Sequence, residues 1–302
     1  MSTTRVNAVV AGLAAVLAAT VAAQEQHPYA TDRPIREPMR FGDGMINTEA
    51  DVYGPTFTPD GRTIYYTLRK DRDGHESIVF SRFEDGRWTP PETASFSTHA
   101  YDKEPYLSPD GRRMFFASTR PQMEGDERTA FDIWVVDRAG DGWGEPRRLG
   151  PAVNGPGYDN YPAVAANGNL HFGSEREAGR GRLDIYVSRF VNGEYQPAEN
   201  LGAGINTAAT DTDPYIAPDE SFIIFTSTRD GTRGEGDLYV SRRENGAWTA
   251  PRHLGDVVNG ASFDYTLFVS PDGRYLFYSR GWGEILQLDL AVVGMDARRS
   301  AP

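Results

Sequence analysis

Five aspartates recur along this 302-residue chain at nearly regular intervals, and their residue type makes them candidates for chemistry. They are Asp51, Asp102, Asp159, Asp211 and Asp264. Carboxylate oxygens bind hard cations such as Ca²⁺, and a ring of acids attracts a basic segment of a partner protein. Two suitably separated carboxylates also cleave glycosidic bonds by acid and base catalysis. The pattern therefore leaves open a divalent-cation site, a docking site and a glycosidase-like site.

An arginine follows each aspartate within the same segment. The first four are Arg69, Arg120, Arg176 and Arg229, and in the fifth segment Gly281 takes that position with Arg280 displaced by one. Opposite charges that recur together predict charge-assisted pairs between neighbouring segments. A residue that every repeat carries is usually needed by every repeat, so we interpret these pairs first as structural.

Function is then expected where the segments differ. Glu104 and Asp213 add acids in two segments, at a position where the others carry Gly54, Tyr161 and Thr266. These two acids complete the set of candidate binding residues formed by the five aspartates and the first four arginines.

Two histidines and one insertion also break the pattern. His99 lies in a link between segments, and His171 occupies a strand position that is apolar in the other copies. A lone histidine in an apolar position is most often a core residue, so no catalytic or metal role is assigned. Residues 121–129 lengthen the second segment and are interpreted as a binding loop. The chain has no Gly-x-Ser-x-Gly motif, so serine hydrolysis is not indicated.

The elements that must position these residues come from a repeat of about fifty residues, a period typical of propeller blades. Five turns mark it: Pro59-Asp60-Gly61, Pro109-Asp110-Gly111, Ala166-Asn167-Gly168, Pro218-Asp219-Glu220 and Pro271-Asp272-Gly273. Short runs of β-branched and aromatic residues between such turns predict four strands per copy. The fourth run carries a proline, which lacks the donor that a central strand needs and therefore indicates the outer rim.

We predict an all-β fold, a five-bladed β-propeller of four-stranded blades. The blades are expected at about 50–99, 100–155, 156–208, 209–261 and 262–293. The last copy lacks its fourth strand, and residues 37–48 are expected to supply it, closing the ring and covering a sheet edge. The recurring aspartates would then ring one mouth of the central channel.

The two ends of the chain lie outside this 37–293 propeller. Residues 1–23 have the basic start, apolar stretch and small-residue end of a signal peptide, with cleavage expected after Ala23. Residues 24–36 and 294–302 are expected to be loose tails. No later segment is apolar enough to span a membrane, so a periplasmic or secreted protein without membrane insertion is predicted.

The composition excludes several classes of partner and of metal site. The formal net charge is −12, which repels a phosphate backbone and argues against nucleic acid. The absence of cysteine excludes disulfides, thiolate metal sites and a lipidated cysteine. A monomer is expected.

One stretch carries a specific family resemblance. It contains Leu201-Gly202, Ile205-Asn206-Thr207, Asp211, Pro214, Pro218-Asp219, Ser227-Thr228-Arg229 and Gly236-Asp237-Leu238-Tyr239. This pattern resembles the WD-like repeat of TolB-type propellers of the bacterial envelope, and the resemblance runs from about residue 38 to 293. It implies an exported propeller used for binding, although TolB has six blades.

These observations lead to one function and one alternative. The first is a non-enzymatic binding or protein-interaction module in the cell envelope, with an envelope protein or glycan as its partner. The alternative is a secreted carbohydrate-active hydrolase or lyase that uses acids in the central funnel. No cofactor is expected apart from a Ca²⁺ or another divalent cation.

Overall fold

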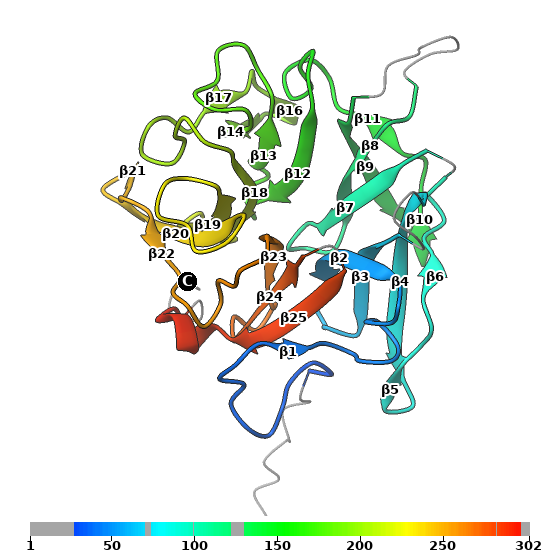
Figure 1. Cartoon of the computed structure of the whole chain (residues 1–302). Coiled ribbons are helices and arrows are strands. Elements are labelled where there is room, and N and C mark those ends of the chain that lie inside the picture. Colours follow the sequence, from blue (N-terminus) through cyan, green and yellow to red (C-terminus); the bar gives the residue numbers. More distant parts are fainter. Residues whose placement is uncertain (1–26, 70–73, 99, 122–129, 282, 297–302) are drawn as a thin grey trace, which may run out of the picture.

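The computed structural model describes residues 27–69, 74–98, 100–121, 130–281 and 283–296 as antiparallel sheets around a central axis (Figure 1). The first strand of each sheet lies innermost, because these strands contact one another in sequence around the ring. The predicted fold class, a five-bladed β-propeller of four-stranded blades, is confirmed.

The first three blades follow one another along the chain. The first contains β2 (Asp51–Phe57), β3 (Thr63–Arg69), β4 (Glu76–Glu84), β5 (Arg87–Trp88) and β6 (Glu92–Thr93). The second contains β7 (Asp102–Leu107), β8 (Arg113–Ser118), β9 (Asp132–Ala139), β10 (Gly142–Trp143) and β11 (Arg147–Arg148). The third contains β12 (Asp159–Val164), β13 (Leu170–Ser174), β14 (Asp184–Ser188) and β17 (Glu199–Asn200), with a small hairpin of β15 (Phe190–Val191) and β16 (Glu194–Tyr195).

The last two blades complete the ring. The fourth contains β18 (Asp211–Ile216), β19 (Phe222–Ser227), β20 (Asp237–Glu244), β21 (Ala247–Trp248) and β22 (Arg252–His253). The fifth contains β23 (Asp264–Val269), β24 (Tyr275–Arg280), β25 (Glu284–Asp289) and β1 (Met39–Arg40). A 3-10 helix, Leu290–Val293, follows β25.

The outer strand of the blades is divided at its proline. Pro91, Pro146 and Pro251 each fall between two short paired pieces: β5 and β6, β10 and β11, and β21 and β22. A proline cannot donate to the sheet, so pairing stops there and resumes one or more residues later. This agrees with the rim position that the sequence predicts for the fourth strand.

The N-terminal strand closes the fifth blade as expected. Met39 pairs with Gln287 and Arg40 with Leu286, so β1 occupies the outer edge beside β25 (Figure 1). Asn47 fixes the closure, because its side-chain amide donates to the Ile285 carbonyl oxygen at 2.8 Å. The equivalent Asn154 makes the same contact within the second blade, to Ile133 at 3.0 Å.

Residues 27–36 do not form the loose tail that the sequence suggests. Tyr29 is buried, with its ring edge-on to Phe57 at 5.2 Å and to Phe277 at 5.8 Å between centroids. The Gln287 amide donates to the Tyr29 carbonyl oxygen at 2.7 Å. The aromatic surface at the closing blade explains the difference, because burying a tyrosine there outweighs the entropy of ordering a short segment. At the other end, Met295 is also buried.

Candidate functional site

The recurring aspartates and arginines form ion pairs inside each blade, at the start of the innermost strand. We call these pairs the Asp–Arg clamps. Their N–O distances are 2.8 Å for Asp51–Arg69, 2.8 Å for Asp102–Arg120, 3.3 Å for Asp159–Arg176, 2.6 Å for Asp211–Arg229 and 2.8 Å for Asp264–Arg280. In the fifth blade Arg280 pairs directly, because it stands opposite Asp264 in the sheet. The predicted pairing is therefore present, but each pair joins two strands of one blade rather than two blades.

The clamps of the second to fifth blades make further hydrogen bonds to the link that arrives from the preceding blade. Asp211 accepts the backbone N–H of Thr207 at 2.6 Å, and Arg229 donates to the Ile205 carbonyl oxygen at 2.7 Å. The Arg229 guanidinium also lies over the Tyr239 ring, 4.8 Å from its centroid. One clamp therefore fastens an incoming link to the first two strands of its own blade.

The clamp aspartates do not form an open acidic ring at the channel mouth. The side chains of Asp102, Asp159, Asp211 and Asp264 have 0% exposure, and only Asp51 reaches 25%. Burial raises the pKa of both Asp159 and Asp264, while their arginine partners oppose that rise. The sequence pattern does not predict this burial, because the burial depends on how tightly the links fold over the strand ends.

A second ring of residues lies deeper, where every innermost strand has a β-bulge. Each bulge holds one residue in the left-handed backbone region, and these residues form what we call the bulge ring. They are Gly54 (φ 65°), Glu104 (φ 56°), Tyr161 (φ 54°), Asp213 (φ 51°) and Thr266 (φ 42°). Only glycine adopts this conformation without steric cost, so four positions store backbone strain.

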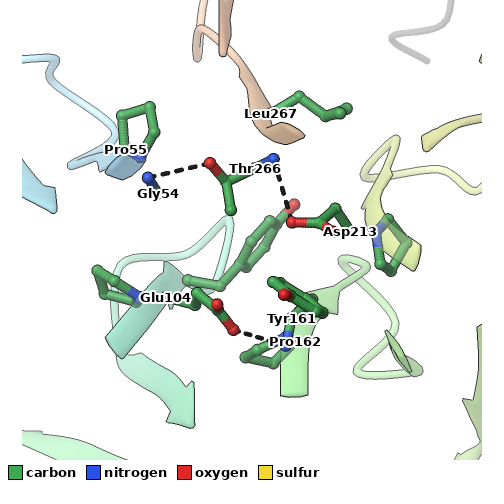
Figure 2. Close-up of a pocket in the computed structure, with 11 residues that line it drawn as sticks. Gly54, Pro55, Glu104, Tyr161, Pro162, Asp213, Thr266 and Leu267 are labelled. Atoms are coloured by element: carbon green, nitrogen blue, oxygen red, sulfur yellow. Dashed lines mark hydrogen bonds between the residues drawn. The ribbon is translucent and has the colours of Figure 1, made fainter. Parts of the chain in front are cut away.

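The bulge ring surrounds a small axial cavity to which all five blades contribute (Figure 2). Its volume is about 30 Å³, and prolines that follow the ring residues, such as Pro55 and Pro162, line it as well. A cavity of this size holds one or two water molecules or one small ion. It is too small for a sugar ring.

Side chains of the bulge ring bind the backbone of the next blade. The Tyr161 N–H donates to Glu104 Oε2 at 3.1 Å, and the Thr266 N–H donates to Asp213 Oδ1 at 3.2 Å. The Gly54 N–H donates to Thr266 Oγ1 at 3.2 Å, as Figure 2 shows. The two acids therefore have a structural task at two blade boundaries.

The two carboxyl groups of the ring differ in their charge balance. Glu104 pairs with Lys103, with Nζ and Oε1 3.2 Å apart, although burial still raises the pKa of Glu104. Burial, followed by the charge of Glu104, raises the pKa of Asp213 well above its usual range. Asp213 Oδ2 is buried and has no hydrogen-bond partner. Asp213 is thus the least compensated carboxyl group at the axis.

The remaining sequence candidates do not join this site. His171 is buried at the boundary between the third and fourth blades, with Nε2 3.9 Å from Glu220 Oε1. Burial lowers the pKa of His171 to about 4, so the ring is neutral at neutral pH. His99 and residues 122–129 of the insertion lie outside the described residues, as does the predicted signal peptide.

Two further features are absent from the described part of the chain. It contains no group of three or more His, Cys, Asp or Glu side chains able to hold a metal ion. It also contains no helix that is long and apolar enough to cross a membrane.

Comparison with known proteins supports the fold. No family model matches the chain, and no curated protein matches it. Among solved structures, a protein of Agrobacterium tumefaciens described as TolB has 19% identity and a TM-score of 0.51, over 77% of this chain and 71% of that one. A protein of unknown function from Dyadobacter fermentans has 15% identity and a TM-score of 0.51, over 89% and 85% of the two chains. At these identities the similarity establishes the propeller fold alone.

Proposed function

We propose that this chain is an exported propeller that acts as a non-enzymatic binding module in the cell envelope, holding an envelope protein or glycan on its surface. The state of the repeated acids carries the proposal. All five clamp aspartates are paired with arginine inside their own blade, and four are fully buried, so their task is to fix the strand ends and the incoming links. The similarity to a TolB propeller agrees with an envelope location.

The same observation argues against the hydrolase alternative. A glycosidase needs two carboxyl groups that face substrate across about 5–10 Å, one of them free to exchange protons. The clamp acids do not face an open funnel, and the axial cavity of about 30 Å³ cannot admit a sugar. Binding is therefore expected on an outer surface.

We assign binding to the face on which the innermost strands begin, which we call the link face. Tyr101 and Tyr158 stand there at equivalent positions of the second and third blades, each directly before a clamp aspartate. They are 44% and 41% exposed, and Tyr158 lies 6.3 Å from the Phe131 ring. Exposed aromatic rings with polar tips are favoured at protein and glycan interfaces.

A retention experiment tests this assignment. The immobilised chain is incubated with envelope extract and, separately, with soluble envelope glycans, and the retained species are identified by mass spectrometry. The Tyr101→Ser/Tyr158→Ser double variant should lose the retained species. The control is Val191→Ser, which changes a 45% exposed residue of the β15–β16 hairpin at the rim of the third blade. It should retain them.

Two results would contradict the proposal. One is equal retention by the wild-type chain and the double variant, which would remove binding from the link face. The other is turnover of an aryl glycoside that disappears in Glu104→Gln or Asp213→Asn, which would favour the hydrolase.

A further inference from the structure

Three buried oxygen atoms without hydrogen-bond partners lie at one blade boundary, between the third and fourth blades. They are Asn160 Oδ1, Thr212 Oγ1 and Asp213 Oδ2. Their residues are 6%, 2% and 2% exposed, so bulk water does not reach them. Buried polar atoms in folded proteins nearly always have a partner, and three orphans in one place call for an explanation.

Gly173 opens the space between these atoms. A Cβ at this position would lie 2.7 Å from Thr212 Oγ1 and 3.4 Å from Asn160 Oδ1, so both oxygens face the volume that a side chain would fill. The same Cβ would lie 3.2 Å from the Tyr161 ring, which lines the axial cavity. The space therefore adjoins the axial cavity, and the Thr212 side chain lies close enough to the Asp213 carboxyl group to lower its pKa, which places that group beside the space too.

The other blades show what this position normally does. Sheet pairing aligns Gly173 with Thr67, Ala117, Thr226 and Ser279. Thr67 Oγ1 accepts the Glu104 N–H at 2.8 Å, and Ser279 Oγ accepts the Gly54 N–H at 3.2 Å. The third blade has no side chain there, and its ring residue Tyr161 offers no carboxylate as Glu104 does. This boundary alone among the five thus combines an open position with unpartnered oxygens in the described structure.

The carboxyl groups near this space bear on whether a water molecule or a cation fills it. Glu104 and Asp213 bring two carboxyl groups to the axis, and Lys103 pairs with only the first. A water molecule could satisfy the hydrogen bonds of the three oxygens while Asp213 is protonated, the form that burial favours, but an ionised Asp213 would keep an unbalanced charge in this buried site. A cation balances that charge and takes oxygen ligands of the carboxylate, amide and hydroxyl types.

We propose that the boundary between the third and fourth blades binds one hard divalent cation of the Ca²⁺ class through Asn160 Oδ1, Thr212 Oγ1 and Asp213 Oδ2. This site differs from the ring of clamp aspartates, which the arginines already occupy. It does not depend on what the link face binds. A cation here would tie the two blades together where the bulge ring provides no direct link.

Calcium-dependent stability and terbium luminescence test the site together. The purified chain is freed of metal with a chelator, and its melting temperature is measured with and without millimolar CaCl₂ at constant ionic strength. Calcium should raise the melting temperature by about 5 °C. Tb³⁺, a hard ion that resembles Ca²⁺, should luminesce on tyrosine excitation because Tyr161 lies beside the site, and CaCl₂ should displace it.

Matched variants separate this site from unspecific binding. Asp213→Asn keeps an oxygen that accepts the Thr266 N–H but loses the charge, and it should abolish both signals. Asp256→Asn removes a carboxylate whose side chain is 75% exposed, and it should leave both unchanged. Thr212→Val keeps the side-chain shape and should weaken Tb³⁺ binding at least about tenfold; it answers the question if Asp213→Asn does not fold. Equal calcium shifts and equal luminescence in the wild-type chain and the folded variants would overturn the proposal and leave water at the site.

Discussion

The Tyr161 backbone N–H donates a hydrogen bond to Glu104 Oε2 across the boundary between the second and third blades, at 3.1 Å. The acceptor comes from the bulge of β7 and the donor from the bulge of β12. The carboxyl group that the sequence offers as a binding residue therefore satisfies a buried backbone group in the neighbouring blade.

Replacing Glu104 should consequently destabilise the fold, and the loss should be larger when the new side chain cannot accept the Tyr161 N–H. Glu104→Ala leaves a buried N–H without a partner and should lower the free energy of unfolding by about 1–3 kcal/mol. Glu104→Gln keeps an amide oxygen for the Tyr161 N–H and should lower it less. Urea unfolding followed by tryptophan fluorescence measures both. If the two variants lose the same stability, the hydrogen bond is not the reason for the acid.

Breaking an Asp–Arg clamp should cost much more stability than breaking an ion pair on the rim. Arg229→Met leaves Asp211, which has 0% side-chain exposure, as an unpaired buried charge. It should lower the free energy of unfolding by about 3–5 kcal/mol. Arg189→Met breaks an exposed pair with Glu199 in the third blade, with exposures of 45% and 59%, and should cost less than about 1 kcal/mol. Similar losses in the two variants would show that the clamps do not hold the blades.

The repeat made the fold predictable, whereas the site depends on features that the repeat does not encode. The turn at Pro59-Asp60-Gly61 and the proline at Pro91 act locally, so they predict strands and rim without tertiary information. The recurrence of Asp211 with Arg229 likewise predicts an ion pair from charge alone. Its placement within one blade depends on sheet register, and each bulge adds a residue that alternation cannot reveal.

Two features of the structure could not be predicted without the closed ring of blades. Tyr29 is buried where the closing fifth blade and Phe57 of the first blade present aromatic rings to it, and nothing in residues 27–36 indicates this surface. Asn160 and Thr212 look like ordinary strand residues in the sequence. Their candidate role as ligands follows only from the space beside Gly173, which their unpartnered oxygens face. No local signal marks the bulge ring, because a proline favours extended backbone in its predecessor and the ring residues have left-handed backbone instead.

The N-terminal segment should contribute to stability through Tyr29. Tyr29→Ala removes a ring that contacts Phe57, Tyr275 and Phe277, and it should lower the free energy of unfolding by about 3 kcal/mol or more. Tyr29→Phe keeps the ring and should change it by less than about 1 kcal/mol. Thermal unfolding of the two variants in parallel provides the measurement. A loose segment would predict no effect from either change.

His171 should make the propeller sensitive to mild acid. Its pKa is lowered from 6.5 to about 4 in the folded chain, so between these values the unfolded chain binds a proton that the folded chain does not. Stability therefore rises with pH across this window and falls on acidification, by a total on the order of 3 kcal/mol from this group. His171→Leu places an apolar side chain in a position that is Ile224 in the next blade and Leu276 in the last. Unfolding free energies measured from pH 4 to 7 should show a shallower slope in this variant than in the wild-type chain.

Arg243→Gln serves as the control, because Arg243 and Glu220 are charged groups beside the imidazole. It removes a cation that disfavours protonation and should raise the pKa of His171 toward its unfolded value, so this variant should lose less stability on acidification than the wild-type chain but more than His171→Leu. Parallel pH profiles for His171→Leu and the wild-type chain would assign the acid sensitivity to other groups.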